Sequence, residues 1–324
     1  MRAVSVHQFG GPEELVLEEL PNPVAKAGEV LVDIKAVGVN PIDTYIRSGI
    51  HAIRPQLPYI AGGDAAGVVL STGEGVTGFA AGDRVYVSAI AGGHFDGLTA
   101  EMAAVPASEV FHLPDNVNFA EGAALGVPCA TAFYALHVRG EAQSGQTVFI
   151  HGASGSVGTA VVQMARSQGM TVIGSVGTDE GRRLVSEQGA DHVLNHTTAG
   201  YLDELASLTG GRGPDLIIEM LANVNLAADM DAVAKFGRIV IVGNRGEITI
   251  NPRTAMMKNL DIVGLALNNA SKDEMTTVHA GLKAGLESGD LKPVIRCEMD
   301  MTDAAKSHEM VLEPGALGKI VIVP

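Results

Sequence analysis

The stretch Gln146–Arg166, which reads QTVFIHGASGSVGTAVVQMAR, constrains the fold of this chain more than any other. An apolar, β-rich run at Thr147–Ile150 stops at a cluster of small residues. Apolar residues then recur at helical spacing, at Val157, Val161, Val162 and Ala165. This pattern predicts a strand, a tight glycine turn and an α-helix in direct succession.

The turn has the spacing of a dinucleotide-binding loop, Ala153-x-Gly155-x-x-Gly158, with Ala153 in the place of the first glycine. Gly155 lets the backbone approach a pyrophosphate, Gly158 lets the helix pack closely on the strand, and free N–H groups at the helix start face the phosphates. A plain tight turn is the alternative, but the strand before the loop and the helix after it favour a cofactor. The predicted contacts in the loop are Ser154, Gly155, Ser156, Val157 and Gly158.

Further short apolar runs follow the loop, each separated from the next by a segment of helical composition. They lie at Met170–Ser175, Asp191–Leu194, Leu216–Ile218, Arg238–Val242 and Asp261–Leu267. Strands that alternate with helices predict an α/β fold with a doubly wound parallel sheet of the Rossmann type. A ligand then lies across the carboxyl ends of these strands.

Composition limits the partners of the chain. Its 324 residues are enough for two domains, and the 22 Lys and Arg against 37 Asp and Glu give a formal charge of −15. Nucleic acid and anionic membranes are therefore unexpected partners, and no apolar run approaches the length of a membrane span. Two cysteines, Cys129 and Cys297, are too few for a disulfide framework, and the beginning MRAVSVHQFG lacks a signal-peptide core. We expect a cytoplasmic protein.

The region before the loop indicates a β-rich domain that extends to about residue 125. Its apolar or alternating runs are Ala3–Val6, Leu15–Glu18, Glu29–Val39, Ala66–Leu70 and Arg84–Val87. The segment Phe119–Leu136 is alanine-rich and predicts a helix. Beyond the nucleotide-binding segment we expect a helix at Lys272–Ser288 and a strand at Gly318–Val323 that returns to the first domain.

Six segments resemble the zeta-crystallin-like quinone oxidoreductases of the medium-chain dehydrogenase/reductase superfamily, and the resemblance covers essentially the whole chain. They read GGPEELVLEELPNP, AVGVNPIDTYIRSG, GEGVTGFAAGDRV, HGASGSVGTAVVQMAR, IIEMLANVNL and VGNRGEITINPR. The resemblance implies a GroES-like β-rich domain built from residues 1–125 and 268–324. A Rossmann domain, residues 126–267, is then inserted between these two parts.

The residues at the family's metal positions predict that this chain binds no metal. Zinc-dependent relatives hold their catalytic metal with a Cys, the His of a Gly-His-Glu motif and a second Cys. Here Asn40, Gly63 and Val127 stand at those positions, and zinc requires three or four thiolate, imidazole or carboxylate ligands around one point. Cys129 is expected to be a small buried residue of the core.

The resemblance places four residues at the catalytic site: Asn40, Asp43, Tyr45 and Thr131. Tyr45 lies against the cofactor in the cleft between the domains. An amide at Asn40 can donate a hydrogen bond to a quinone oxygen as that oxygen gains negative charge, and Thr131 is a candidate second donor. The alternative role for Asp43 is that of a helix cap or turn residue that binds Arg47.

Other positions match family contacts to the nicotinamide half of the cofactor, largely through backbone groups. They are Asn225, then Val242, Gly243, Asn244 and Arg245 after the fifth strand, and Leu265, Ala266 and Leu267 on the sixth. A surface ion pair is the alternative for Arg245, and we assign it no catalytic role.

The end of the second strand predicts NADPH rather than NADH. NAD-specific folds place an acid there, but the sequence reads Ser175-Val176-Gly177, which leaves Gly177 uncharged and open. Asp179 and Glu180 lie slightly beyond, where they are either ribose ligands or first-turn acids of the next helix. His196 matches the histidine that contacts the 2′-phosphate in the zeta-crystallin branch. Some relatives carry a lysine at the position of Gly181, and Arg182 or Arg183 are unaligned substitutes for it.

The function implied is a zinc-independent transfer of reducing equivalents from NADPH to a quinone. One alternative is NADPH-dependent reduction of an activated double bond in an enal, enone or enoyl thioester. Another is a non-enzymatic crystallin or RNA-binding role, against which the acidic charge argues. The apolar edge strand at Asp261–Leu267 predicts a homodimer, and the resemblance extends this to a homotetramer. The loops Ile50–Tyr59 and Ala89–Gly97 are expected to line the quinone pocket.

Overall fold

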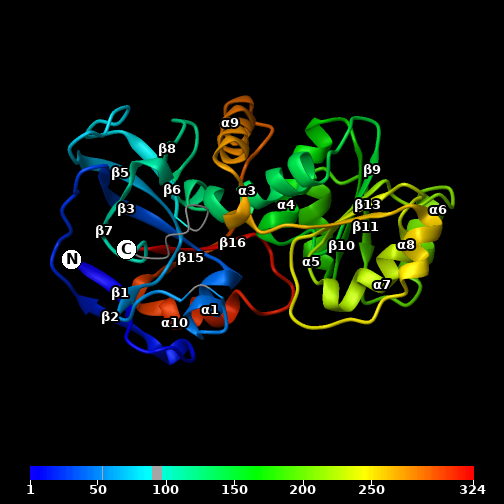
Figure 1. The fold of residues 1–324 in the computed structure, drawn as a ribbon, viewed down its shortest axis with the longest axis horizontal. Helices are drawn as coiled ribbons and strands as arrows, with labels where there is room; N and C mark the ends of the chain where they lie inside the picture. The colour runs from blue at the N-terminus through cyan, green and yellow to red at the C-terminus, as the bar shows by residue number, and fades with distance from the viewer. Residues whose placement is uncertain (53, 90–96) are drawn as a thin grey trace.

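The structure is a computed structural model that describes residues 1–52, 54–89 and 97–324. Two domains lie side by side, the β-rich domain at the left of Figure 1 and the parallel sheet with its helices at the right. Both termini lie in the β-rich domain (Figure 1). The chain therefore leaves its first domain, forms the second and returns.

Six strands form the sheet of the nucleotide-binding domain: β9 (Thr147–Ile150), β10 (Thr171–Val176), β11 (His192–Asn195), β12 (Leu216–Glu219), β13 (Arg238–Ile241) and β14 (Asp261–Gly264). Their order is β11-β10-β9-β12-β13-β14, and each neighbouring pair is parallel. This is the strand order of a dinucleotide-binding sheet, in which the winding direction reverses beside the first strand. The predicted Rossmann fold is confirmed.

The helices of this domain are α4 (Ser156–Ser167), α5 (Asp179–Glu187), α6 (Tyr201–Leu208), α7 (Ala222–Ala232) and α8 (Pro252–Lys258). The middle strands are short runs of β-branched residues that are buried on both faces, as in β12, where Ile217 and Ile218 are fully buried. Helices on both faces of a parallel sheet cause this burial, so the strands read as continuous apolar runs rather than alternating ones.

The sixth strand is shorter than predicted. It ends at Gly264, which pairs with Ile241, the last residue of β13. The amide of Leu265 still donates to the Ile241 carbonyl at 3.1 Å, but Leu267 begins a 3-10 helix, Leu267–Asn269. The prediction of a strand to Leu267 is wrong because β13 offers no partner beyond Ile241.

The β-rich domain has two sheets. A small one contains β1 (Arg2–Val6), β2 (Leu15–Glu19) and β4 (Tyr59–Ile60); the larger contains β3 (Glu29–Val39), β5 (Asp64–Thr72), β6 (Arg84–Ser88), β7 (Met102–Pro106), β8 (Val110–His112), β15 (Ile295–Asp300) and β16 (Lys319–Val323). The order of the larger sheet is β15-β16-β3-β5-β6-β8, and β7 also pairs with β3. Ile320 of β16 pairs with Val39 of β3, so the tail returns as expected.

The remaining helices connect or cap these sheets. They are α1 (Pro41–Arg47), α2 (Phe119–Gly122), α3 (Ala130–Phe133), α9 (Lys272–Ser288) and α10 (Ala304–Met310), with 3-10 turns at Pro12–Glu14, Ala107–Glu109 and Met301–Asp303. The predicted single helix at Phe119–Leu136 is instead broken into α2, α3 and two π-helical segments, Leu125–Cys129 and Tyr134–Arg139. Pro128 lies inside the first π-helical segment and cannot donate a backbone hydrogen bond. No helix in the described residues has both the length and the apolarity to cross a bilayer.

A buried polar cluster lies beneath the carboxyl ends of β9 and β12. His151, directly after β9, places Nε2 2.8 Å from Asp229 Oδ1 of α7 and 3.3 Å from Glu219 Oε2 of β12. All three residues are buried. Burial raises the pKa of Glu219 and of Asp229 to about 7 and lowers the pKa of His151. Two adjacent buried carboxyl groups cannot both ionise cheaply, so the pair holds a proton near neutral pH.

The cluster predicts a specific pH dependence of stability. The folded protein keeps a proton that the unfolded chain releases above about pH 4, so this contribution is complete below about pH 4 and is lost as the pH rises through about 7. Asp229→Asn places an amide N–H where the shared proton lies. Between about pH 5 and pH 8 the free energy of unfolding should decrease in both proteins. We expect the decrease to be smaller in Asp229→Asn than in the wild type, by roughly 1 kcal/mol or more.

Urea denaturation at both pH values measures this difference. Asp231→Asn, an exposed position on the same helix, is the matched control and should follow the wild type. An unchanged pH dependence in Asp229→Asn would contradict a shared proton.

Candidate active site

The dinucleotide loop has the predicted geometry. A Cβ added at Gly158 would lie 2.6 Å from Ala153 Cα, so glycine is required for the close packing of α4 on the loop. Gly155 is the N-cap of α4, and no side chain caps the helix there. The space at Gly155 is open, since a Cβ would meet nothing closer than 3.4 Å. The uncapped N–H groups of a helix start fit a pyrophosphate.

Two residues predicted to lie at the ribose end of the cofactor are Gly177, directly after β10, and His196, directly after β11. A Cβ added at Gly177 would lie 2.9 Å from Nε2 of His196, so the imidazole lies directly against this turn. Partial desolvation lowers the pKa of His196, and the neighbouring His151 lowers it further. The imidazole is therefore close to the strand end where a 2′-phosphate would lie.

The acids after this turn belong to the next helix. Thr178 is the N-cap of α5 and accepts a hydrogen bond from the Gly181 amide at 3.0 Å, which places Asp179 and Glu180 in the first helical turn. The first-turn alternative for the two acids is therefore the observed one. Arg182 is held elsewhere, because its Nη1 donates to the Val193 carbonyl at 2.6 Å.

The loops after β12 and β13 approach each other. A Cβ added at Gly243 would lie 2.3 Å from the Met220 carbonyl, and the Val242 amide donates to the Glu219 carbonyl at 2.8 Å. Asn225 Nδ2 donates to Glu219 Oε1 at 3.2 Å, which links the loop to the buried cluster. Their predicted contacts with the nicotinamide half remain predictions.

The other predicted residues in this region differ in exposure. Asn244 and Arg245 are exposed, Leu265 is half-buried, Ala266 is exposed and Leu267 is buried. The Arg245 backbone amide donates a hydrogen bond to Asn223 Oδ1 at 2.9 Å. No ion pair of Arg245 occurs in the described part of the chain, so the surface-pair alternative has no support there.

The predicted catalytic corner is a buried network around Asn40. Asn40 precedes α1 and forms a capping box with Asp43, whose Oδ2 accepts the Asn40 amide hydrogen at 2.8 Å. The Asn40 side chain donates from Nδ2 to Asp64 Oδ2 at 2.9 Å and, over a longer 3.4 Å, to the Gly38 carbonyl. Its Oδ1 accepts a hydrogen bond from Nζ of Lys319.

Asp43 has the capping role that was one of its two predicted alternatives. Burial raises its pKa to about 7. The predicted contact with Arg47 is wrong for the described residues, where no ion pair joins the two and Arg47 Nε and Nη1 have no hydrogen-bond partner. The capping geometry accounts for this, because it turns the carboxylate back toward the start of α1.

The other two predicted catalytic residues, Tyr45 and Thr131, lie on two different helices. Tyr45 is half-buried on α1, and Thr131 is buried on α3. Cys129 is buried beside Thr131, and burial raises the pKa of its thiol to about 12. A thiol that holds its proton so strongly is a packing residue, as predicted.

Two contacts at the start of β16 were not predicted from the sequence. The Gly318 amide donates to the Ser154 carbonyl at 2.8 Å, and Gly318 also bridges to Gly155. The next residue, Lys319, is buried and binds Asn40 and Asp64, with 3.3 Å between Nζ and Asp64 Oδ2. Consecutive residues therefore contact the dinucleotide loop and the catalytic corner.

The residues at the zinc positions of relatives, Asn40, Gly63 and Val127, offer no thiolate, imidazole or carboxylate. One cluster in the described residues does have metal-ligand atoms close together: His151, Glu219 and Asp229, within 4.8 Å of one another. A proton shared by the two carboxyl groups accounts for this arrangement without a cation. The cluster supports the strands beneath the cofactor loops.

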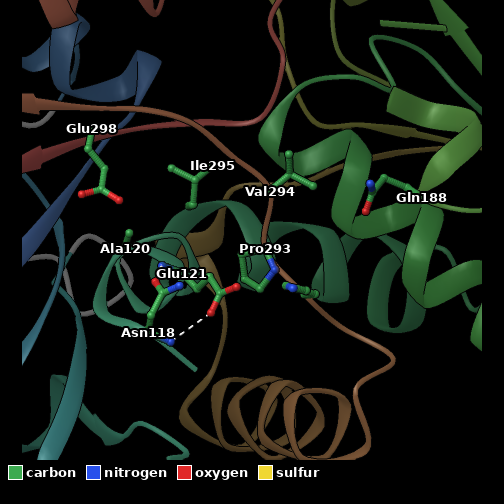
Figure 2. A pocket seen from close by; sticks show the side chains of 9 residues that line it. Asn118, Ala120, Glu121, Gln188, Pro293, Val294, Ile295 and Glu298 are labelled. Atoms are coloured by element: carbon green, nitrogen blue, oxygen red, sulfur yellow. Dashed lines mark hydrogen bonds between the residues drawn. The ribbon is translucent and has the colours of Figure 1, made fainter. Parts of the chain in front are cut away.

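A polar pocket of about 420 Å³ lies outside the predicted site, where the segment before β15 passes between the domains. It is lined by Asn118, Ala120, Glu121, Gln188, Lys292, Pro293, Val294, Ile295 and Glu298. Figure 2 shows the hydrogen bond between Asn118 and Glu121 at its wall, which caps α2. None of the predicted site residues lines this pocket. Parts of the predicted pocket loops, residue 53 and residues 90–96, lie outside the described residues.

Comparisons with known proteins agree with this arrangement. Residues 26–115 match the family "Alcohol dehydrogenase GroES-like domain", and residues 156–283 match "Zinc-binding dehydrogenase". A quinone oxidoreductase of Homo sapiens is 43% identical over 326 residues, which cover 100% of this chain and 98% of that protein. The quinone oxidoreductase of Sus scrofa is 44% identical with the same coverage.

Solved structures of similar proteins contain NADPH. The quinone oxidoreductase of Escherichia coli complexed with NADPH is 28% identical and has a TM-score of 0.88. The match covers 100% of this chain and 100% of that chain. A mycobacterial protein complexed with NADPH is 27% identical with a TM-score of 0.90 and the same full coverage. With its GroES-like and Rossmann domains and this identity over its whole length, the chain belongs to the zeta-crystallin-like quinone oxidoreductases of the medium-chain dehydrogenase/reductase superfamily.

Proposed function

We propose that this protein transfers a hydride from NADPH to a quinone without a metal. The observation that carries the proposal is the contact of Gly318 with the dinucleotide loop and of Lys319 with Asn40. A cofactor held at the loop would then lie in register with a corner that has amide and hydroxyl donors, and whose zinc positions, Asn40, Gly63 and Val127, carry no thiolate or imidazole. When bound, NADPH supplies the hydride, and the protein supplies position and electrostatics.

The cofactor would be held along the carboxyl ends of the strands. The open helix start at Gly155 fits the pyrophosphate, and Ser154, Ser156 and Val157 flank it. His196, which lies against Gly177, would bind the 2′-phosphate. The residues that would contact the nicotinamide half are Asn225 on α7 and, after β13 and β14, Val242, Gly243, Asn244, Arg245, Leu265, Ala266 and Leu267.

The quinone would be held against Tyr45 and the corner. The second N–H of the Asn40 amide has only the long contact to Gly38, so it is the donor best placed to bind a quinone oxygen. Thr131 would be the second donor. A quinone that accepts a hydride becomes an aromatic hydroquinone anion, so the reaction needs little help from a buried acid.

We also propose a homo-oligomer and a cytoplasmic location. β14 is an edge strand of its sheet, and the same domain has exposed apolar side chains at Phe236, Met256 and Met257. Pairing of two β14 strands would cover this edge, and a tetramer is an extension by family resemblance. Light scattering at micromolar concentration would measure the mass. Both cysteines are free, which supports a reducing compartment.

The first test is the reaction itself. We expect purified protein, treated with chelator, to reduce 1,2- and 1,4-quinones with NADPH faster than 2-alkenals, because the corner needs no metal. Steady-state assays with and without chelation measure this. Two results together would contradict the metal-free site: about one zinc per chain found by elemental analysis of the untreated protein, and loss of activity on chelation. Faster reduction of alkenals would favour the double-bond reductase instead.

The second test is cofactor preference. A charge-assisted hydrogen bond from His196 to the 2′-phosphate should contribute roughly 1.5–3 kcal/mol, or about 10- to 150-fold in affinity for NADPH over NADH. Binding of the dianion raises the imidazole pKa, so NADPH should bind more weakly as the pH rises above neutrality, while NADH binding changes little.

Titration of both cofactors into wild type and His196→Ala at several pH values measures both effects. His192→Ala, an exposed histidine at the other end of β11, is the control. Equal affinities in the wild type would overturn the preference. An unaltered ratio in His196→Ala would place the phosphate elsewhere.

The third test concerns Tyr45. As an aromatic wall, it should position the nicotinamide ring, so Tyr45→Ala should lower kcat about ten- to hundredfold while thermal unfolding stays near that of the wild type. Tyr45→Phe retains the wall and should stay active. Wild-type kcat and KM in Tyr45→Ala would reduce Tyr45 to a packing residue.

A further inference from the structure

Lys319 is one of the most deeply buried charged residues of the described chain. It is 1% exposed, and its ammonium binds Asn40 Oδ1 and Asp64 Oδ2, both of which are also buried. Burial raises the pKa of Asp64, and the ammonium of Lys319 is the largest of the contacts that oppose this rise. A charge is expensive to bury, even when it is paired, so a lysine at this place requires an explanation beyond packing.

We propose that Lys319 is the positioning cation of the catalytic corner, in the place that a metal ion has in zinc-dependent relatives. The ammonium lies beside two of the three positions aligned with zinc ligands, since it binds Asn40 directly and binds Asp64, the neighbour of Gly63. Val127, the third position, approaches Asp64 through its backbone. This inference rests on the proposed reduction of a quinone at Asn40.

Lys319 orients the Asn40 amide. The two ends of an amide differ, because the oxygen accepts and the nitrogen donates. Lys319 binds the oxygen and Asp64 binds the nitrogen at 2.9 Å, so only one orientation of the amide satisfies both charges. That orientation leaves the second N–H, with its 3.4 Å contact to Gly38, as the donor for a substrate oxygen.

The ammonium also strengthens that donor. Hydrogen bonds in series polarise one another in a low-dielectric site, so a cation on the amide oxygen makes the amide N–H a better donor. Negative charge that develops on a quinone oxygen would then be stabilised through Asn40 by the charge on Lys319. Lys319 itself touches neither substrate nor cofactor in this arrangement.

The backbone fixes where the ammonium lies. A Cβ added at Gly38 would lie 2.6 Å from Lys319 Cε and 2.0 Å from the Ala123 carbonyl, so the lysine stem passes over a glycine that leaves room for it. The Lys319 amide donates to the Val294 carbonyl at 2.8 Å, and the preceding Gly318 amide donates to the Ser154 carbonyl at 2.8 Å. The position of Lys319 is therefore tied to the dinucleotide loop.

Two variants separate this role from simple neutralisation of Asp64. Lys319→Met removes the cation and leaves a buried carboxylate unpaired. Lys319→Met combined with Asp64→Asn removes both charges and keeps an oxygen acceptor for the Asn40 nitrogen. Exposed Lys306→Met on α10 is the control for loss of a lysine. Each is measured for thermal unfolding, NADPH affinity by titration, and kcat and KM with a 1,4-quinone.

We expect Lys319→Met to lower kcat about tenfold or more, with NADPH affinity within about twofold of the wild type, since the transition state loses more than the ground state. The double variant should recover thermal stability but not kcat. If Lys319→Met does not fold, kcat of the double variant alone decides the test. Wild-type kcat in the double variant would overturn the proposal, because Lys319 would then only neutralise Asp64. A wild type that reduces no quinone would refute the proposed function instead.

Discussion

The pairing of β16 with β3, held at one end by the dinucleotide loop, is the constraint on which the arrangement of this protein depends. Ile320, Val321 and Ile322 pair with Val39, Gly38 and Val37, while Gly318 just before them binds Ser154. One short segment thus belongs to the sheet of one domain and touches the cofactor loop of the other. The two halves of the site are therefore positioned by backbone hydrogen bonds rather than by side chains alone, which favours a geometry fixed within a fraction of an ångström.

Two buried polar networks support the two halves. Beneath the cofactor loops, His151 contacts Glu219 and Asp229, and burial raises the pKa of both carboxyl groups to about 7. Beneath the catalytic corner, the charge of Asp64 is balanced by Lys319. Both arrangements avoid an uncompensated charge in a low-dielectric interior, the first by protonation and the second by an ion pair.

Sequence patterns predicted the elements whose signal is local. The glycine loop, the five strands around it and the helix Lys272–Ser288 have periodicity or turn residues that do not depend on distant partners. β15 escaped prediction because Arg296, Glu298 and Asp300 make it read as a polar segment, which suits an edge strand. The end of the sixth strand depends on where β13 ends, which its own residues do not reveal.

In the site, too, the sequence predicted the residues whose role depends on nearby residues and missed the one whose partner is distant. Gly158 and the capping role of Asp43 follow from local geometry, whereas Lys319 is defined by Asn40, a partner 279 residues away. A lysine before an apolar strand normally indicates the solvated end of that strand. Only the pairing of β16 with β3, beyond which β5 contributes Asp64, makes this lysine an interior cation.

The place of β16 also bears on how the chain folds during synthesis. In the larger sheet it lies between β15 and β3, so residues 29–112 cannot complete their sheet until residues 319–323 have left the ribosome. The nucleotide-binding domain is continuous in sequence and can fold as soon as it emerges. The β-rich domain must wait, and Val37–Val39 of β3, next to the part of this strand that pairs with β7, expose an unpaired edge in the meantime. Its early strands are therefore the part of the nascent chain most in need of protection from aggregation.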